Sequence, residues 1–288
     1  GTFAGVIVRL DGPEPRDRTP PDDPASNPLS SGIPNYDAYS MEVVQRIGYD
    51  SFTPDNGVLL AKFKDSLRGG NGGPNGFNSY IWVIDAHPED IQQVDFVKPN
   101  GDVVMRTVAD YRQLNDALFH AGLDSGSEFE WKDPHNRLHF YVVDLDTTED
   151  GILTYTLAVR SLDGSGPGER GGELSGVGEA KVREPYTPIH FTLTNTGTAP
   201  GADGSLHPDN AAPFLSSDLF RLSVSLEGRG WSARLLNALT AVEVGGSRQI
   251  TVFASAGPGA SQEARLALRA TSESDPTQRT SATVTLSR

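Results

Sequence analysis

Cysteine is absent from the 288 residues, so the chain can form no disulfide framework, zinc–thiolate site or catalytic thiol. No apolar run approaches the roughly 18 residues of a membrane-spanning helix, which argues against an integral membrane protein. Uninterrupted segments are scarce as well, because 31 Gly and 20 Pro are spread along the chain. These residues favour turns, so we expect a mainly β protein with many short strands.

The motifs of common hydrolases are also missing. The six histidines contain no His-Glu-x-x-His pair, no Gly-x-Ser-x-Gly elbow occurs, and the glycine-rich stretch 68–76 lacks the Lys-Ser/Thr of a phosphate loop. His135 and His139 could share one face of a strand and bind a metal, although a turn histidine followed by a sheet histidine is the simpler interpretation. Trp82 and Trp131 could stack on sugars, but such residues more often pack in a sheet. The sequence therefore offers no catalytic residues and no identifiable zinc site.

Charge is distributed unevenly along the chain. The net charge is -14, and residues 182–288 contain 9 basic and 9 acidic groups, so residues 1–181 carry the whole excess. Such an acidic region repels phosphate backbones, which argues against nucleic acid as a partner. The chain begins with Gly1 and shows no signal-peptide pattern. We therefore expect it to be a processed or truncated piece of a longer protein.

Alternating and β-branched segments predict strands along most of the chain. One helix is expected over residues 107–122, where Tyr111, Leu114 and Leu118 recur at helical spacing and Gly122 ends the pattern. Two segments around Pro99-Asn100-Gly101 predict a hairpin. The expected strands before the glycine-rich linker are 6–10, 39–46, 58–63, 80–84, 91–97, 103–106, 129–131, 138–145 and 152–160.

The chain divides into two predicted domains. Residues 1–163 form a β-sandwich-like domain with a Pro- and Asp-rich loop at 11–34, and residues 164–181 form a glycine-rich linker. Residues 182–288 contain seven expected strands, one Trp and no expected helix, which is typical of an immunoglobulin-like sandwich without its disulfide. The segment from Gly230-Trp231 to Gln249-Ile-Thr-Val resembles the immunoglobulin-like module of bacterial alpha-galactosidases.

Acidic turns are the best candidates for a metal. Asp144, Asp146 and Asp150 lie around a predicted hairpin, and clustered carboxylates on a tight turn can offer Ca²⁺ its oxygen ligands. The spacing departs from that of an EF-hand loop, and an acidic hairpin without metal is the simpler interpretation. Asp50 and Asp55 allow the same two interpretations. Calcium is therefore a predicted cofactor, with Asp144, Asp146 and Asp150 as its ligands.

A longer resemblance covers about residues 1–163. Tyr39-Ser-Met-Glu-Val-Val-Gln-Arg-Ile-Gly-Tyr-Asp-Ser51, followed by Gly57-Val-Leu-Leu-Ala-Lys62, is similar to the segment after the catalytic domain in secreted zinc metallopeptidases of the immune-inhibitor-A and gametolysin type. Residues 110–122, 126–129 and 138–142 resemble the actinobacterial members in particular.

The resemblance implies a secreted, extracellular and non-catalytic accessory region. Such a region would support an upstream catalytic domain or bind a protein or polysaccharide substrate. The alternative is a secreted carbohydrate- or cell-surface-binding protein built from the same modules. An exposed row of aromatic residues would favour that alternative, and an apolar face without its partner would favour the peptidase region.

Overall fold

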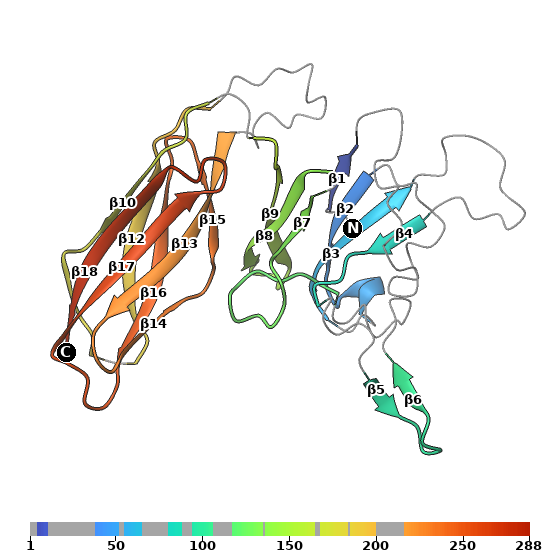
Figure 1. Cartoon of the computed structure of the whole chain (residues 1–288), viewed down its shortest axis with the longest axis horizontal. Coiled ribbons are helices and arrows are strands. Elements are labelled where there is room, and N and C mark those ends of the chain that lie inside the picture. Colours follow the sequence, from blue (N-terminus) through green and yellow to red (C-terminus); the bar gives the residue numbers. More distant parts are fainter. Residues whose placement is uncertain are drawn as a thin grey trace, which may run out of the picture. The chain divides into compact units, whose positions relative to one another are not determined.

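The structure is a computed structural model of the whole chain. It describes residues 5–10, 38–51, 55–64, 80–87, 94–105, 117–134, 136–164, 168–183, 185–199 and 216–288. The chain forms two compact units (Figure 1). Unit 1 comprises residues 1–121 and 125–157, and unit 2 comprises residues 122–124 and 158–288.

Unit 1 contains two sheets and a separate hairpin (Figure 1), and the last strand of its second sheet continues into residues 158–161, which are assigned to unit 2. Strands lie at the positions predicted before residue 162, and the hairpin confirms the turn predicted at Pro99–Gly101. Residues 91–93 and 106 of the two strands predicted for this hairpin lie outside the described residues. A 3₁₀ turn, η1 (Gly48–Asp50), follows the second strand. The four-stranded sheet has the order β1 (Gly5–Arg9), β2 (Ala38–Val44), β3 (Gly57–Lys64), β4 (Tyr80–Val83); the three-stranded sheet has the order β7 (Glu130–Asp133), β8 (Leu138–Thr147), β9 (Leu153–Ser161); the hairpin joins β5 (Val94–Val97) and β6 (Val103–Met105).

Aromatic side chains join the two sheets of unit 1. Tyr39 on β2 lies with its ring centroid 4.9 Å from that of Phe140 on β8 and 6.1 Å from that of Trp131 on β7. Tyr39 and Phe140 are almost completely buried. Tilted ring pairs at these distances add stability beyond the area they bury, so this cluster forms the centre of the unit.

Unit 2 is a two-layer β-sandwich (Figure 1). Its last strand pairs antiparallel with β17 and parallel with β11, so the chain ends inside the larger sheet. The smaller sheet has the order β10 (Gly172–Gly176), β12 (Thr187–Asn195), β16 (Ser247–Ala256), β14 (Trp231–Leu235); the larger sheet has the order β11 (Glu179–Lys181), β18 (Arg279–Ser287), β17 (Glu263–Ser272), β13 (Ser217–Glu227), β15 (Leu239–Glu243).

One apolar core lies between the layers of unit 2. Phe191 and Leu193 from the smaller sheet meet Leu266, Leu268 and Ala270 from the larger sheet, and all five are fully buried. Ala267 and Arg269, which alternate with them on the same strand, point the other way, because successive side chains of a strand face opposite sides. The alternation read from the sequence is therefore the alternation of the core.

Two expectations need correction. Residues 107–116 of the expected helix lie outside the described residues, but residues 117–122 are described and are not helical. The reason is a backbone pairing, because the N–H and C=O of Phe119 both bond to Val58 at 2.9 Å. The second half of the expected linker is also not a linker, since residues 172–176 and 179–181 form β10 and β11.

Glycine in β10 serves close packing. A Cβ at Gly172 would lie 3.0 Å from the Phe220 ring, and a Cβ at Gly176 would lie 2.9 Å from the Phe191 ring. In the sequence these glycines suggest a flexible linker. In the structure their lack of a side chain lets the backbone of β10 pack directly against the phenylalanine rings of the core. The predicted loop at 11–34 lies outside the described residues.

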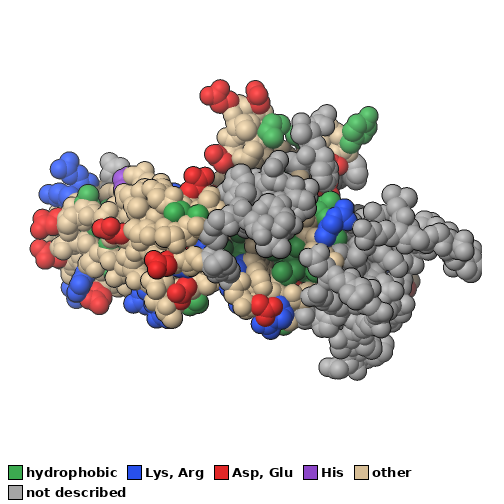
Figure 2. Space-filling model, turned by 90° about the horizontal axis from the view of Figure 1, so that it is seen from above, with side chains coloured by type: hydrophobic (Ala, Val, Ile, Leu, Met, Phe, Trp, Pro, Cys, Tyr) green, Lys and Arg blue, Asp and Glu red, His purple; other side chains and the backbone are tan. Residues whose placement is uncertain are grey.

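The described chain is mainly β, as predicted. Among the described ranges, no helix is long and apolar enough to cross a membrane. On the face that Figure 2 shows, unit 2 carries acidic and basic side chains interspersed, in keeping with its balanced charge.

Candidate functional site

The turn after β2 exposes two large side chains. Gly48 adopts a φ of 58°, a conformation that side chains disfavour, and starts the 3₁₀ turn. The turn is closed by the Asp50 N–H, which donates to the Ile47 carbonyl at 3.0 Å. Tyr49 at its tip is 98% exposed and Ile47 is 48% exposed. An ordered backbone thus holds an aromatic side chain in solvent.

Gln45 ties this turn to the turn between β8 and β9. Its Nε2 donates to the Gly151 carbonyl at 2.7 Å, and its Oε1 accepts the Leu153 N–H at 3.0 Å. Ile152 lies between those two partners and is 42% exposed. We call Ile47, Tyr49 and Ile152 the Tyr49 surface. Exposed Asp50 and Asp150 lie beside it in sequence, so it combines apolar and acidic side chains.

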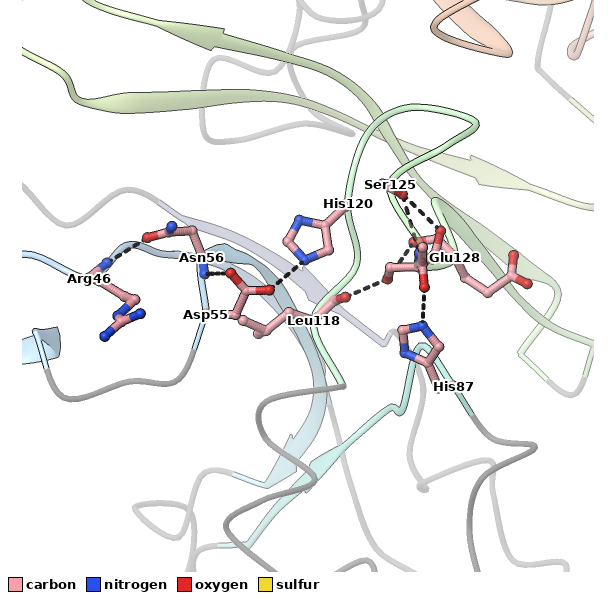
Figure 3. Close-up of polar contacts among 10 residues, drawn as sticks. Arg46, Asp55, Asn56, His87, Leu118, His120, Ser125 and Glu128 are labelled. Carbon is pink, nitrogen blue, oxygen red and sulfur yellow. Dashed lines mark hydrogen bonds and ion pairs between the residues drawn. The ribbon is translucent and has the colours of Figure 1, made fainter. Parts of the chain in front are cut away.

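The segment that leads into β3 is fixed by short polar contacts (Figure 3). Asn56 accepts the Arg46 N–H with its Oδ1 at 2.7 Å, and Asp55 accepts the Asn56 N–H with its Oδ1 at 2.7 Å. The other carboxylate oxygen of Asp55 lies 3.7 Å from Nε2 of His120. Arg46 is next to Ile47, so these contacts also fix one end of the exposed turn.

His120 lies in a segment that pairs closely with β3. Its N–H donates to the Glu128 carbonyl at 3.1 Å, and Gly57 lies so close that a Cβ there would be 2.9 Å from the His120 ring. Burial lowers the pKa of His120; the Asp55 carboxylate raises it and the nearby His87 lowers it, so the net shift is downward. His120 therefore favours the neutral form in the folded chain.

A second polar cluster lies inside unit 1. The Tyr39 hydroxyl donates to the Asp133 carboxylate, and Asn136 Nδ2 donates to the Tyr39 oxygen at 2.8 Å and to Asp133 at 3.0 Å. Burial would raise the pKa of Asp133, but these hydrogen bonds and the charge of Lys62 outweigh burial and lower it. The cluster is shielded from solvent, so it can stabilise the unit but cannot meet a substrate.

His139 is fully buried in the same unit. Its Nε2 lies 3.1 Å from a Glu130 carboxylate oxygen, and its ring lies 3.8 Å from that of Tyr141. The simpler interpretation of this histidine as a sheet residue agrees with these contacts. His135, its suggested metal partner, lies outside the described residues.

The predicted calcium ligands lie on β8 and the following turn. Asp144 Oδ1 accepts the Leu145 N–H at 3.0 Å, and Asp146 Oδ1 accepts the Thr147 N–H at 2.8 Å. Asp150 lies in the exposed turn. Among the described residues, no group of three or more His, Asp or Glu is placed to hold a metal ion.

The calcium set therefore stays a prediction, and its ligands are not assembled by the described geometry. Melting curves with and without Ca²⁺ test it, on the wild type and on Asp146→Ala. Binding would stabilise the wild type alone, by about 1 kcal/mol at a free concentration several-fold above Kd. An unchanged melting temperature would show a solvated acidic hairpin.

Sequence reasoning did not find the Tyr49 surface. Gly48-Tyr49-Asp50-Ser51 is part of the resemblance and, through Asp50, of a candidate metal-binding turn, but no local pattern shows that a turn tyrosine will be exposed. The glycine at position 48 was the available signal, since Gly before an aromatic residue suits a tight turn with a positive φ.

Comparison with known proteins assigns both units. A family model described as a middle domain matches residues 1–162, and one described as a Peptidase M6-like domain matches residues 173–288. A curated protein of Arthroderma benhamiae, named "Putative secreted metallopeptidase", is 40% identical over 286 residues. That match covers 96% of this chain and 39% of the relative, so the chain spans about two fifths of the relative's length.

Solved structures add little to this comparison. WR4, a member of the C. elegans MSP family, matches with a TM-score of 0.23 and 14% identity, over 39% of this chain and 90% of that one. The secreted serine protease VesC from Vibrio cholerae matches with a TM-score of 0.27 and 12% identity, over 73% of this chain and 42% of that one. Neither likeness is close enough to support a conclusion about the fold.

The two family matches define a metallopeptidase-related region built from two β-rich units. The chain belongs to the family that the middle-domain model describes. The relationship to metallopeptidases agrees with the predicted resemblance. The actinobacterial origin stays a prediction, and the curated relative is fungal.

Proposed function

We propose that the chain is the non-catalytic accessory region of a secreted metallopeptidase-like protein, where it supports the catalytic domain. Support comes from the Peptidase M6-like match in unit 2 and from the name of the fungal relative. The relative is called secreted, so we place this chain outside the cell as well. In this role the accessory region offers a surface on which the catalytic domain docks. The proposed surface lies in unit 1.

The Tyr49 surface is the observation that carries this proposal. Single exposed apolar residues are common, but here three such residues lie on two turns joined by both polar ends of Gln45. A tyrosine buries 150–250 Å² when a partner covers it and loses little conformational entropy. Acidic neighbours add a polar rim, which is the usual composition of an interface. The catalytic domain is the proposed partner of this surface.

The alternative carbohydrate-binding function lacks its expected feature. Among residues whose side chains are described, only Tyr49 and Tyr186 are exposed aromatics, and they belong to different units. A surface that binds sugar rings by stacking would need several exposed aromatic side chains on one face. The described surface thus favours the accessory region over a binding protein that stacks on sugars.

Unit 2 has a proposed identity of its own, an immunoglobulin-like module. A four-stranded and a five-stranded sheet around one core support this. The tryptophan of this unit, Trp231, lies on β14 in the smaller sheet. It is buried, and its Nε1–H donates to the Ser261 carbonyl at 3.0 Å.

Binding to the catalytic domain tests the proposed function. The chain would be titrated with the peptidase domain encoded by the same gene, using the wild type, Tyr49→Ser and Tyr186→Ser. Tyr186 lies in unit 2 and is 63% exposed, so Tyr186→Ser is a control that also removes an exposed tyrosine ring. We expect Tyr49→Ser to weaken binding about tenfold or more, a loss of about 1.4 kcal/mol, and Tyr186→Ser to have little effect. Equal effects of both variants would contradict the assigned surface.

A further inference from the structure

An open trough of about 400 Å³ lies on the outer face of the larger sheet in unit 2. Strand register explains its shape, because the outward side chains of β13, β17 and β18 stand in rows across the sheet. The middle row has only small side chains and forms the floor, while the rows on either side contain Arg and Glu and form the walls. The rows are Ser223–Arg269–Ser281, Ser225–Ala267–Thr283 and Glu227–Arg265–Thr285.

One wall of the trough is suited to an anion. Arg269 is exposed and stands between two hydroxyl side chains, Ser223 and Ser281. A guanidinium has five N–H donors in a planar fork and binds a carboxylate with two parallel hydrogen bonds. Within the described ranges Arg269 has no ion pair, unlike Arg221 on β13, whose Nε lies 2.6 Å from Glu273. Its charge is therefore available to a ligand.

The opposite wall carries both signs of charge. Arg265 stands directly across from Glu227 in the strand register. A ligand there must supply an acceptor for Arg265 and a donor for Glu227, so a polymer with an acid on every unit would be repelled by Glu227. A peptide can satisfy both, because acidic side chains alternate with backbone N–H groups.

The floor narrows the choice of ligand further. Ser225 and Thr283 offer hydroxyls, Ala267 and Thr283 offer one methyl each, and no aromatic ring is among the described residues that line the trough. A sugar ring would find no surface on which to stack, and an apolar side chain would bury little area. Small floor residues let a peptide backbone approach the sheet closely. Arg265 and Arg269 are four residues apart on β17, about 13 Å, so a single extended chain fits between the walls.

We propose that this trough binds an extended acidic peptide segment, with one of its carboxylates held by Arg269, Ser223 and Ser281. The site is distinct from the Tyr49 surface, which lies in unit 1. It adds recognition of an acidic polypeptide to the proposed accessory role. Binding relies on charge, so affinity falls as the salt concentration rises.

The test measures binding of a fluorescent ten-residue peptide of Gly, Ser and three Asp to the whole chain. Arg269→Gln should weaken binding about tenfold or more, because it removes a charge-assisted contact. Ala267→Leu should weaken it similarly with all charges intact, since it fills the floor. Arg248→Gln is the control, because Arg248 is exposed on β16 in the other sheet and its loss changes net charge equally. Each variant would first be shown to unfold at the wild-type midpoint.

Three results would overturn the proposal. Equal weakening by Arg248→Gln and Arg269→Gln would show attraction by net charge alone. Equal binding of the same peptide with Asn in place of Asp would exclude carboxylate recognition. Tighter binding of a uronic-acid oligosaccharide than of the peptide would assign the trough to an acidic sugar. Loss of binding in Arg269→Gln and Ala267→Leu, with Arg248→Gln unaffected, supports it.

Discussion

The two units place their buried polar groups differently. In unit 2 these groups lie near strand ends, such as Ser272, which donates to Asp218 at 2.7 Å, and the space between the sheets is apolar. In unit 1 a cluster of Tyr39, Asp133 and Asn136 lies where the two sheets meet. The comparison teaches that alternation is enough to specify unit 2, whereas unit 1 also depends on polar partners distant in sequence.

The largest expected effect is a cavity in the core of unit 2. Phe191 is fully buried on β12, so Phe191→Ala should lower the free energy of unfolding of unit 2 by about 3–5 kcal/mol. Val177→Ala, at an exposed turn position, should change it by less than about 0.5 kcal/mol. Urea unfolding followed by Trp231 fluorescence measures both. Similar effects of the two variants would refute a single tight core.

The next effect concerns the polar cluster of unit 1. Tyr39→Phe removes the hydroxyl that bonds to the Asp133 carboxylate, and should cost about 1.5–3 kcal/mol. The pKa of Asp133 is lowered in the folded chain, so its stabilising contribution is present above the unfolded pKa of about 3.9 and is lost as pH falls through the folded pKa. Asp133→Asn should therefore reduce stability at pH 7 and flatten its fall below about pH 4. An unchanged acid profile in Asp133→Asn would contradict the cluster's role.

A close approach of backbones gives the third prediction. A Cβ at Gly57 would lie 2.8 Å from Leu118 Cβ and 3.1 Å from the Phe119 carbonyl oxygen, so Gly57→Ala should push the 117–120 segment away from β3. We expect a cost of about 1–3 kcal/mol from overpacking. Gly178→Ala is the control, since a Cβ at Gly178 would meet no atom within 4 Å and its φ is unexceptional. Hydrogen exchange of the Phe119 amide reports the pairing, and unchanged protection in Gly57→Ala would contradict it.

Titration of His120 gives the smallest effect. Its pKa is lowered in the folded chain, so the unfolded chain takes up the proton first and stability is lost as pH falls through the unfolded value of about 6.5. The loss should stay below about 1.4 kcal/mol per pH unit, the limit for one proton. His120→Gln should reduce the slope between pH 7 and 5. An identical slope in the variant would assign the dependence to another group.

Much of the fold could be predicted from the sequence, because several strands and turns are indicated by patterns within their own segments. Leu266, Leu268 and Ala270 alternate with exposed residues, and the structure buries all three. Pro99-Asn100-Gly101 between two β-rich segments likewise predicted the hairpin that β5 and β6 form. Such patterns are local, so they are visible without knowledge of the partner strands.

The remaining features depend on partners far away in the chain. Tyr39 and Asp133 are 94 residues apart, and neither residue signals the other. Gly172 and Gly176 suggest a linker by composition, but two phenylalanine rings of the folded core require them. The candidate surfaces were missed for the same reason. The Tyr49 surface combines two turns that Gln45 joins across 106 residues of sequence, and the rows of the trough exist only once three strands are in register.

We propose that this region supports a peptidase without cleaving peptides itself. The direct measurement is turnover of casein and of fluorogenic peptides by purified residues 1–288, with and without added zinc. We expect no turnover above buffer under either condition, because the sequence has no zinc-hydrolase motif. Peptide cleavage by this chain that zinc restores and a chelator abolishes would contradict it.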